Sequence, residues 1–180
     1  AVVNFKSMAA IVDALGGVDI NLEGLEYYYI NYNVAVSEDY EGFPKSKTRR
    51  VLTEADAGVS VHLDGLQAVS YARIRKLDSD FVRVERQQRV VQAIYRQLGT
   101  LDLMQLTGVM TAYIGKVNTN VTLAQAASLL TSVMGYSDVQ VQTLRVPAEG
   151  AYRSDMLSDT YYIIPKLERC RQDIAAFLGN

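Results

Sequence analysis

Two kinds of hydrophobic pattern alternate along this chain, and their order limits the folds that it can adopt. Short apolar runs, some of them alternating with polar residues, indicate strands at residues 1–5, 18–22, 59–63 and 139–147. Longer runs with apolar side chains every three or four positions indicate helices between them. Strands that alternate with helices predict an α/β fold, and we expect an α-β-α sandwich around a central mixed sheet.

The predicted helices carry recognisable end signals. Gly16 and Gly17 would end the first helix, and Thr122 with Gln125 three residues later forms a capping box at the start of another. The last helix begins with Pro165 near its first position, and its apolar face consists of Leu167, Cys170, Ile174, Phe177 and Leu178. The helices are expected at residues 6–17, 63–75 (a short helix that runs into a strand), 83–98, 101–117 (as one or two helices), 122–135 and from 165 onward.

The segment from residue 23 to 50 shows neither pattern clearly, so we expect a long irregular excursion with a strand at residues 30–36. Four tyrosines gather between residues 27 and 32. Their rings could form a platform for carbohydrate, and a strand face or a packing cluster is the simpler interpretation. The acidic residues between positions 38 and 41 are expected to be solvated.

The composition fits one folded domain and excludes several functions. A chain of 180 residues can bury one ordinary core and is short for two. Its net charge of −2 argues against general affinity for nucleic acid. No apolar run approaches the roughly 18 residues that cross a bilayer. Cys170, the one cysteine, permits no internal disulfide, and His62, the one histidine, rules out a histidine-rich metal site.

Positive charge is concentrated in one stretch of this slightly acidic chain. Six basic and three acidic side chains lie between Arg73 and Arg89, which gives this run a net charge of +3. If "YARIR" forms a strand, Tyr71, Arg73 and Arg75 share one face, and Ala72 and Ile74 take the other. We therefore expect a strand with one face on the core and one face lining a cleft.

The second part of the run is predicted to be a helix start. Asp80 is well placed as its N-cap. Arg83, Arg86 and Gln87 follow at spacings of three and four, so they share a helical face near the N-terminus. Guanidinium groups match phosphate oxygens in pairs, and a helix N-terminus adds free N–H groups. The strand end and the helix start could thus converge on a phosphorylated ligand.

Two other interpretations of the arginine run stay open on spacing alone. A charged helix start after a charged loop is most often a solvated face, and Lys76 and Arg89 are expected to belong to that class. A patch for RNA or DNA is less favoured, because the surroundings are not basic and aromatic residues are not interleaved with the arginines.

Residues 63–94 resemble the LytR-CpsA-Psr family, in which a Leu-x-Gly-x-x-Ala lead-in precedes Tyr-x-Arg-x-Arg and then Asp-x-x-Arg-x-x-Arg-Gln. The opening stretch at residues 2–20, with a Phe and a helix that ends in Gly-Gly-Val-Asp, resembles a second family segment. Val82 departs from the pattern, which often has Gly there. The matching residues are Leu63, Gly65, Ala68, Tyr71, Arg73, Arg75, Asp80, Arg83, Arg86 and Gln87.

This resemblance implies a membrane-anchored enzyme at the outer face of the bacterial cell membrane. Such enzymes transfer phosphate-linked glycopolymers, of the teichoic acid or capsule type, from a polyprenyl-pyrophosphate carrier to peptidoglycan; an older view held them to be transcriptional attenuators. Arg73, Arg75 and Arg83 would contact the pyrophosphate, and Asp80 and Gln87 would belong to the same catalytic site. Arg86 would either bind the substrate or be structural.

The resemblance also implies a missing part. The family's domain begins with a segment whose aspartates hold Mg²⁺, and no such motif is present here, so we expect the metal ligands and a membrane anchor upstream of Ala1. Residues 1–180 would form a single domain, the C-terminal two-thirds of the family's catalytic domain. We expect no transferase activity from the chain alone, and pairing of two copies through an exposed sheet edge. A binding-only protein for polyprenyl pyrophosphate and a nucleic-acid-binding regulator remain the alternatives.

Overall fold

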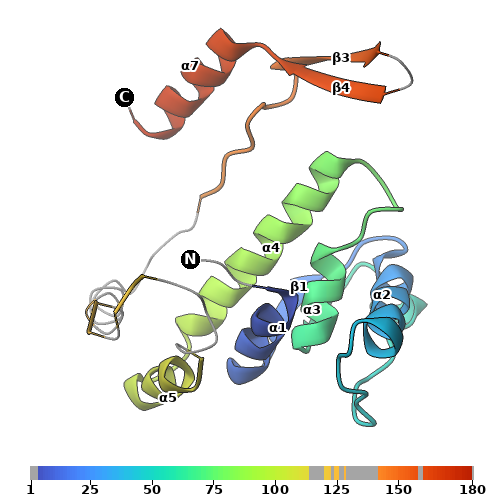
Figure 1. Ribbon diagram of the computed structural model, residues 1–180, viewed down its shortest axis with the longest axis vertical. Coiled ribbons are helices and arrows are strands. Elements are labelled where there is room, and N and C mark those ends of the chain that lie inside the picture. The colour runs from blue at the N-terminus through green and yellow to red at the C-terminus, as the bar shows by residue number, and fades with distance from the viewer. Residues whose placement is uncertain are drawn as a thin grey trace. The chain divides into compact units, whose positions relative to one another are not determined.

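The computed structural model describes residues 4–113, 120–122, 124–125, 128, 142–157 and 160–179. The chain divides into two compact units, residues 1–139 and 140–180, and each is described by itself (Figure 1). The elements of the first unit are α1 (Phe5–Ala14), β1 (Val18–Asn21), α2 (Glu26–Tyr40), the 3-10 helix η1 (Glu54–Asp56), β2 (Ser60–Leu63), α3 (Gly65–Ala72), α4 (Asp80–Leu98) and α5 (Leu103–Tyr113). Those of the second are β3 (Tyr152–Leu157), β4 (Thr160–Pro165) and α7 (Leu167–Phe177).

The strands form antiparallel pairs. β1 pairs with β2, with Val18 opposite Leu63, and β3 pairs with β4. The inward residues of the first pair are buried and their neighbours are exposed, as expected of a sheet with one face on the core. The α/β class is confirmed, and among the described residues the strands make two separate two-stranded sheets in place of one mixed sheet.

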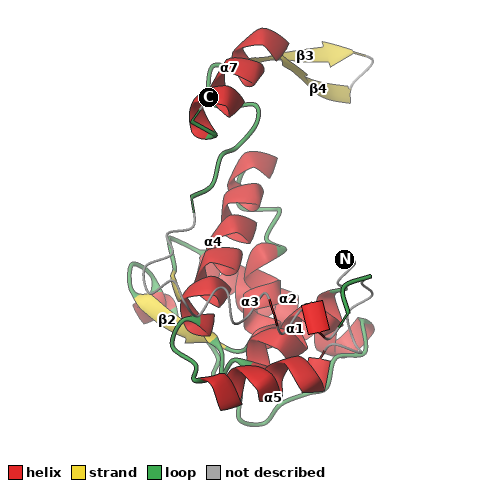
Figure 2. Ribbon diagram, turned by 90° about the vertical axis from the view of Figure 1, so that its left-hand side faces the viewer, coloured by secondary structure: helices red, strands yellow, loops and turns green. Residues whose placement is uncertain are grey.

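Helix α3 lies at the centre of the first unit and contacts α1, α2 and α4 (Figures 1 and 2). Every residue from Gly65 to Tyr71 is buried. A Cβ atom at Gly65 would overlap the carbonyl oxygen of Ala9, so α1 and α3 approach each other too closely for any larger residue. This contact explains the glycine of the Leu-x-Gly-x-x-Ala pattern.

Several predicted elements are confirmed. Helix α1 begins after Asn4, whose side chain accepts a hydrogen bond from the Ser7 amide at 2.8 Å. The strands at 18–22 and 59–63 and the helix at 83–98 are present within one to three residues of their predicted ends. The strand predicted at 1–5 is wrong for Phe5, which is helical, and its first three residues lie outside the described part.

The irregular segment predicted at 23–50 is wrong over its first half, where α2 runs for 15 residues. Its buried face carries Glu26, Ile30, Val34 and Ser37 at helical spacing. Two of these four are polar, so the stripe that faces the core does not stand out as apolar, and the neighbouring tyrosines favour strand on local propensity. Burial against α3 decides in favour of helix.

The strand predicted for "YARIR" is also wrong. Helix α3 continues to Ala72, Arg73 is its C-cap, and residues 74–79 form the loop to α4. Tyr71 and Ile74 are both buried, at 0% and 1% exposure. Their spacing of three residues suits a helix end and not a strand, on which they would point to opposite faces.

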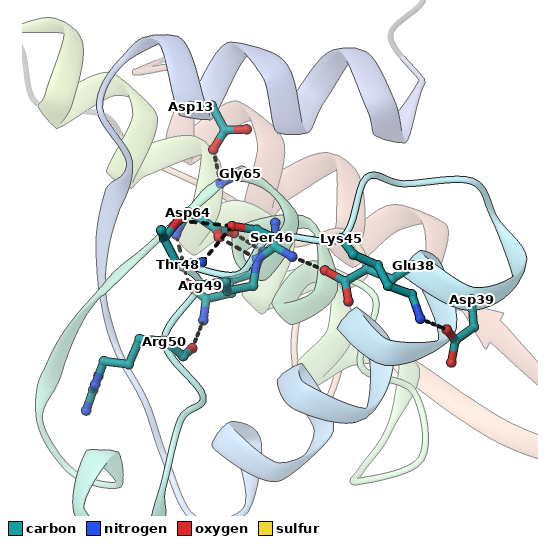
Figure 3. A network of polar contacts seen from close by, with 11 residues as sticks. Asp13, Glu38, Asp39, Lys45, Ser46, Thr48, Arg49, Arg50, Asp64 and Gly65 are labelled. Carbon is teal, nitrogen blue, oxygen red and sulfur yellow. Dashed lines mark hydrogen bonds and ion pairs between the residues drawn. The ribbon is translucent and has the colours of Figure 1, made fainter.

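A polar network fixes the loop after α2 to the start of α3 (Figure 3). Arg49 donates to Asp64 at 2.5 Å and also pairs with Glu38, and its side chain is 13% exposed. Asp64 caps α3 by accepting from the Gln67 amide at 2.8 Å. The Gly65 amide donates to Asp13 of α1 at 2.6 Å. Glu38, which was expected to be solvated, therefore helps to hold this part of the fold together.

The remaining predictions fall on α5 and the second unit. Residues 103–113 are helical as predicted, and Thr122 and Gln125 exchange the two hydrogen bonds of a capping box, at 2.9 and 3.3 Å. The rest of that helix, like residues 139–141 of the predicted strand, lies outside the described residues, and 142–147 are not a strand. Pro165 ends β4 and does not begin α7; on α7 only Cys170 is buried.

Candidate functional site

An open pocket of about 560 Å³ lies where α1, α3 and α4 meet. Its polar wall carries four of the residues that the sequence predicts as a phosphate site, namely Arg73, Arg75, Arg83 and Gln87. Its remaining lining is largely apolar and consists of Phe5, Met8, Val69, Ala72, Val90 and Val91, with Asn4 and Asn33. The pocket thus combines a cluster of positive charge with a hydrocarbon-like surface.

Arg73 is held at the polar wall by three different contacts. Its two terminal nitrogens donate to the two carboxylate oxygens of Glu41, at 2.6 and 2.7 Å. One of them also donates to the Ser37 hydroxyl at 3.2 Å, and the guanidinium lies 4.6 Å from the centre of the Phe5 ring. The hydrogen bond from Arg73 holds the pKa of Glu41 below its ordinary value. The arginine is therefore fixed in place with its charge balanced.

The sequence did not identify the partners of Arg73. Glu41 was expected to be solvated, and Phe5 was expected in a strand. Both come from segments far from the arginine run along the chain, and α2 itself was not predicted. A close Arg–Glu pair of this kind leaves no trace in local sequence periodicity.

Arg75, Arg83 and Gln87 come from the loop and from the first turns of α4. Ser79 caps the helix by accepting from the Val82 amide, and Asp80, which was predicted as the cap, is the first helical residue. Asp80 forms an ion pair with Arg83 at 2.8 Å and does not line the pocket. Arg75 is exposed and forms no ion pair with any described residue, so its donors are available to a ligand.

Arg86 lies elsewhere, although it was predicted on the same helical face. Its side chain is 2% exposed, and its Nε donates to Glu26 at 2.6 Å. Its other two nitrogens donate to the carboxylate of Asp78. Burial opposes the charge, but these hydrogen bonds outweigh it and hold the pKa of Arg86 above its ordinary value. With its donors engaged inside the protein, Arg86 does not reach the pocket.

The other two basic residues of the run also have partners. Lys76 lies 5.6 Å from the centre of the Tyr32 ring, and Arg89 pairs with Glu23 at 3.1 Å and donates to the Tyr71 hydroxyl at 3.3 Å. Neither lines the pocket. The run thus divides into three side chains that face the pocket and three that hold neighbouring segments.

The acidic side chains among the described residues do not gather into a metal-binding cluster. Within them, no group of three or more His, Cys, Asp or Glu side chains is close enough to hold a metal ion. The carboxylates nearest the pocket, Glu41, Asp78 and Asp80, each bind an arginine. This wall of the pocket presents guanidinium groups, so it suits an anion. Among the described helices, none is long and apolar enough to cross a membrane.

Comparisons with known proteins agree on one family. Residues 1–173 match the sequence profile of the LytR_cpsA_psr family. The polyisoprenyl-teichoic acid–peptidoglycan teichoic acid transferase TagU of Bacillus cereus is 29% identical over 175 residues, which cover 96% of this chain and 48% of TagU. The corresponding transferase TagV of Bacillus subtilis is 21% identical over 182 residues, which cover 98% of this chain and 42% of TagV.

Solved structures share the fold. The crystal structure of B. subtilis TagV matches with a TM-score of 0.67 at 19% identity, covering 97% of this chain and 60% of that one. A structure of TagT bound to LIIa-WTA matches with a TM-score of 0.64 at 22% identity, covering 99% and 60%. The chain spans about half the length of the curated relatives it matches. With nearly its whole length inside the family profile, the chain belongs to the LytR_cpsA_psr (LytR-CpsA-Psr) family.

Proposed function

We propose that this chain carries the phosphate-binding wall of a cell-envelope transferase, which moves a phosphate-linked glycopolymer from a polyprenyl-pyrophosphate carrier to peptidoglycan. One observation carries the proposal: Arg73, Arg75, Arg83 and Gln87 line one pocket together with an apolar wall. A polyprenyl pyrophosphate likewise combines a negatively charged head group with an apolar hydrocarbon chain. The names of the relatives, which are teichoic acid transferases, support the substrate class.

The pocket residues suit the chemistry of phosphoryl transfer. A sugar hydroxyl attacks the phosphorus that carries the polymer, the new P–O bond forms, and the bond to the remaining lipid phosphate breaks. Negative charge builds up on the phosphoryl oxygens and on the leaving phosphate. Guanidinium groups placed at those oxygens stabilise the charge. Arg75 has free donors for this role, and Arg73 and Arg83 are held beside it by single carboxylates.

For the magnesium ion that the family resemblance implies, the described residues hold no group of three or more candidate ligands, and the carboxylates of Glu41 and Asp80 bind arginines. We propose that its ligands stand upstream of residue 1, and that residues 1–180 form the C-terminal two-thirds of one catalytic domain. The chain alone would then bind the lipid pyrophosphate without turning it over. A membrane anchor upstream, a position at the outer face of the membrane and pairing of two copies through a sheet edge complete the proposal.

Calorimetric titration of the 180-residue chain with farnesyl pyrophosphate, a short soluble polyprenyl pyrophosphate, tests the site. Arg75→Ala and Arg83→Ala should each weaken binding by about tenfold or more, because each removes charge-assisted hydrogen bonds to phosphate. Arg96→Ala is the matched control, since it removes the same charge from an exposed position of α4 outside this pocket. Equal affinity of the wild type and both pocket variants would refute the assignment.

The nucleic-acid alternative makes a different prediction. It requires DNA binding that weakens steeply with salt and that depends on the same arginines. The net charge of −2 and the pairing of Arg73 and Arg83 with carboxylates leave little charge for a phosphate backbone. A gel-shift titration in 50 and 200 mM salt with random duplex DNA should show no salt-dependent complex.

A further inference from the structure

Arg86 connects three segments that are separate along the chain. Its Nε donates to Glu26 in the first turn of α2, and its two terminal nitrogens donate to both oxygens of Asp78 in the loop before α4. Arg86 and Glu26 are almost completely buried, at 1% and 2% exposure. Glu26 uses its second oxygen to accept from the Glu23 amide at 2.8 Å. The guanidinium is thus bound on two sides within the core.

The loop that Asp78 belongs to carries a pocket residue. Ile74 at its start is 1% exposed, and Leu77 packs against the hydrophobic core. Asp78 is fixed by Arg86, and Ser79 begins the helix as its cap. Arg75 lies between these fixed points and lines the pocket. The path of this short loop, and with it the position of the Arg75 side chain, depends on both ends being held.

Helix α4 carries two further pocket residues next to Arg86. Arg83 and Gln87 stand four residues apart and so lie one above the other on the helix surface, while Arg86 points to the interior. Because Arg86 is hydrogen-bonded to both Glu26 and Asp78, the helix that carries it cannot easily rotate about its axis. The pairing of Arg86 therefore bears on the direction in which Arg83 and Gln87 project.

Stability alone is a weak reason for this arrangement. Buried ion pairs contribute little more than well-packed apolar residues would, because both charges lose their water. A planar guanidinium also fixes the orientation of its side chain, because its paired N–H donors match a carboxylate in one geometry. An ion pair at this place is better explained by a need for orientation.

We propose that Arg86, with Glu26 and Asp78, is a positioning unit for the anion site: it does not touch the ligand, and it sets the geometry of Arg75, Arg83 and Gln87. The inference rests on the proposed function of the pocket. It assigns to Arg86 a role behind the residues that contact the substrate, and it adds Asp78 and Glu26 to the functional residues; the sequence did not indicate Glu26.

The sharpest test removes Asp78, because charge and geometry then predict opposite results. Loss of a carboxylate beside an anion site should strengthen the binding of farnesyl pyrophosphate if only charge matters. A positioning role predicts that Asp78→Ala weakens binding about tenfold, as losses of supporting hydrogen bonds do at other preorganised sites. Asp78→Asn keeps one acceptor for Arg86, so its affinity should lie between those of the wild type and Asp78→Ala. Amide hydrogen exchange should speed up at residues 74–79 in Asp78→Ala.

Glu23→Ala is the matched control, because it also removes a carboxylate from an arginine of α4, Arg89, which does not line the pocket. Its affinity should equal that of the wild type. If Asp78→Ala gives no folded protein, Asp78→Asn decides in the same titration. Wild-type or tighter affinity of a folded Asp78 variant overturns the positioning role. If Arg75→Ala binds farnesyl pyrophosphate as tightly as the wild type, the pocket assignment itself is wrong. The failure of the positioning role and the failure of the proposed function are therefore distinguishable.

Discussion

Glu41 binds Arg73 through two parallel hydrogen bonds, at 2.6 and 2.7 Å, and so joins the end of α2 to the end of α3 at the rim of the pocket. The two residues stand far apart in the sequence, and neither lies in a regular part of its helix: Arg73 is the C-cap of α3 and Glu41 that of α2. The pair fixes one guanidinium in the wall of the pocket, and the Glu41 carboxylate balances its charge.

The Glu41–Arg73 pair should make stability depend on pH in the acid range. The pKa of Glu41 is lowered in the folded protein by the Arg73 hydrogen bond, below the ordinary value of 4.5. Its contribution is therefore present above pH 4.5 and is lost as the pH falls through the folded pKa. Melting temperatures of the wild type and Glu41→Gln should differ at pH 6, and the difference should shrink as the pH falls below 4.5. A difference that stays constant over this range would contradict the pairing.

His62 should titrate above the ordinary value of 6.5. Its ring nitrogens lie 2.8 Å from Asp19 and 2.8 Å from the Gly16 carbonyl, and the Asp19 hydrogen bond is the main cause of the raised pKa. The stabilisation is then complete below pH 6.5 and is lost as the pH rises through the folded pKa. As the one histidine of the chain, His62 gives a single proton-NMR titration curve. Asp19→Asn should move that curve to lower pH.

Gly65 should tolerate no side chain. A Cβ atom there overlaps the Ala9 carbonyl, so Gly65→Ala must push α1 and α3 apart and should lower the free energy of unfolding by about 2–3 kcal/mol. Gly108→Ala provides the opposite control, because α5 offers open space at that position and alanine favours helix by about 0.5–1 kcal/mol. Urea unfolding measures both changes, and equal stability of the two variants would be inconsistent with the helix contact.

Removal of Glu26 should be much more costly than removal of an exposed glutamate. Glu26→Ala leaves the buried Arg86 without one of its two partners, which typically costs about 3–5 kcal/mol. Glu54→Ala, at an exposed position of η1, should change the free energy of unfolding by less than about 0.5 kcal/mol. Urea unfolding monitored by circular dichroism would show the contrast. A loss at Glu26 as small as that at Glu54 would argue against the buried pair.

Local pattern in the sequence predicted those parts of the molecule in which the buried stripe is apolar. Val18, Ile20, Val61 and Leu63 alternate, and β1 and β2 follow from them. Helix α2 was missed because Glu26 and Ser37 occupy its buried stripe, and each has a partner from another segment: Arg86 for the glutamate and Arg73 for the serine. Tertiary pairing of this kind cannot be read from periodicity.

The candidate site shows the same limit. Arg75, Arg83 and Gln87 stand close together along the chain, so their spacing indicated a shared pocket although the predicted strand at residues 71–75 was wrong. Arg86 has the same charge and nearly the same position on α4, and only its contacts with the buried Glu26 and with Asp78 show that it faces inward. The sequence pattern indicates the candidate arginines, and the structure shows which of them line the pocket.

Phe5 should contribute to ligand binding through Arg73. Its ring centre lies 4.6 Å from the guanidinium carbon, and this contact holds Arg73 without competing for its hydrogen-bond donors. Phe5→Leu keeps an apolar side chain in the pocket wall but removes the π face, a loss of about 0.5–1 kcal/mol at a partly exposed site. Farnesyl pyrophosphate should therefore bind about two- to fivefold more weakly in calorimetric titration. Tyr40→Leu, which removes a ring that is 85% exposed and outside the pocket, should leave the affinity unchanged. Equal affinities of Phe5→Leu and the wild type would show that Glu41 and Ser37 alone determine the position of Arg73.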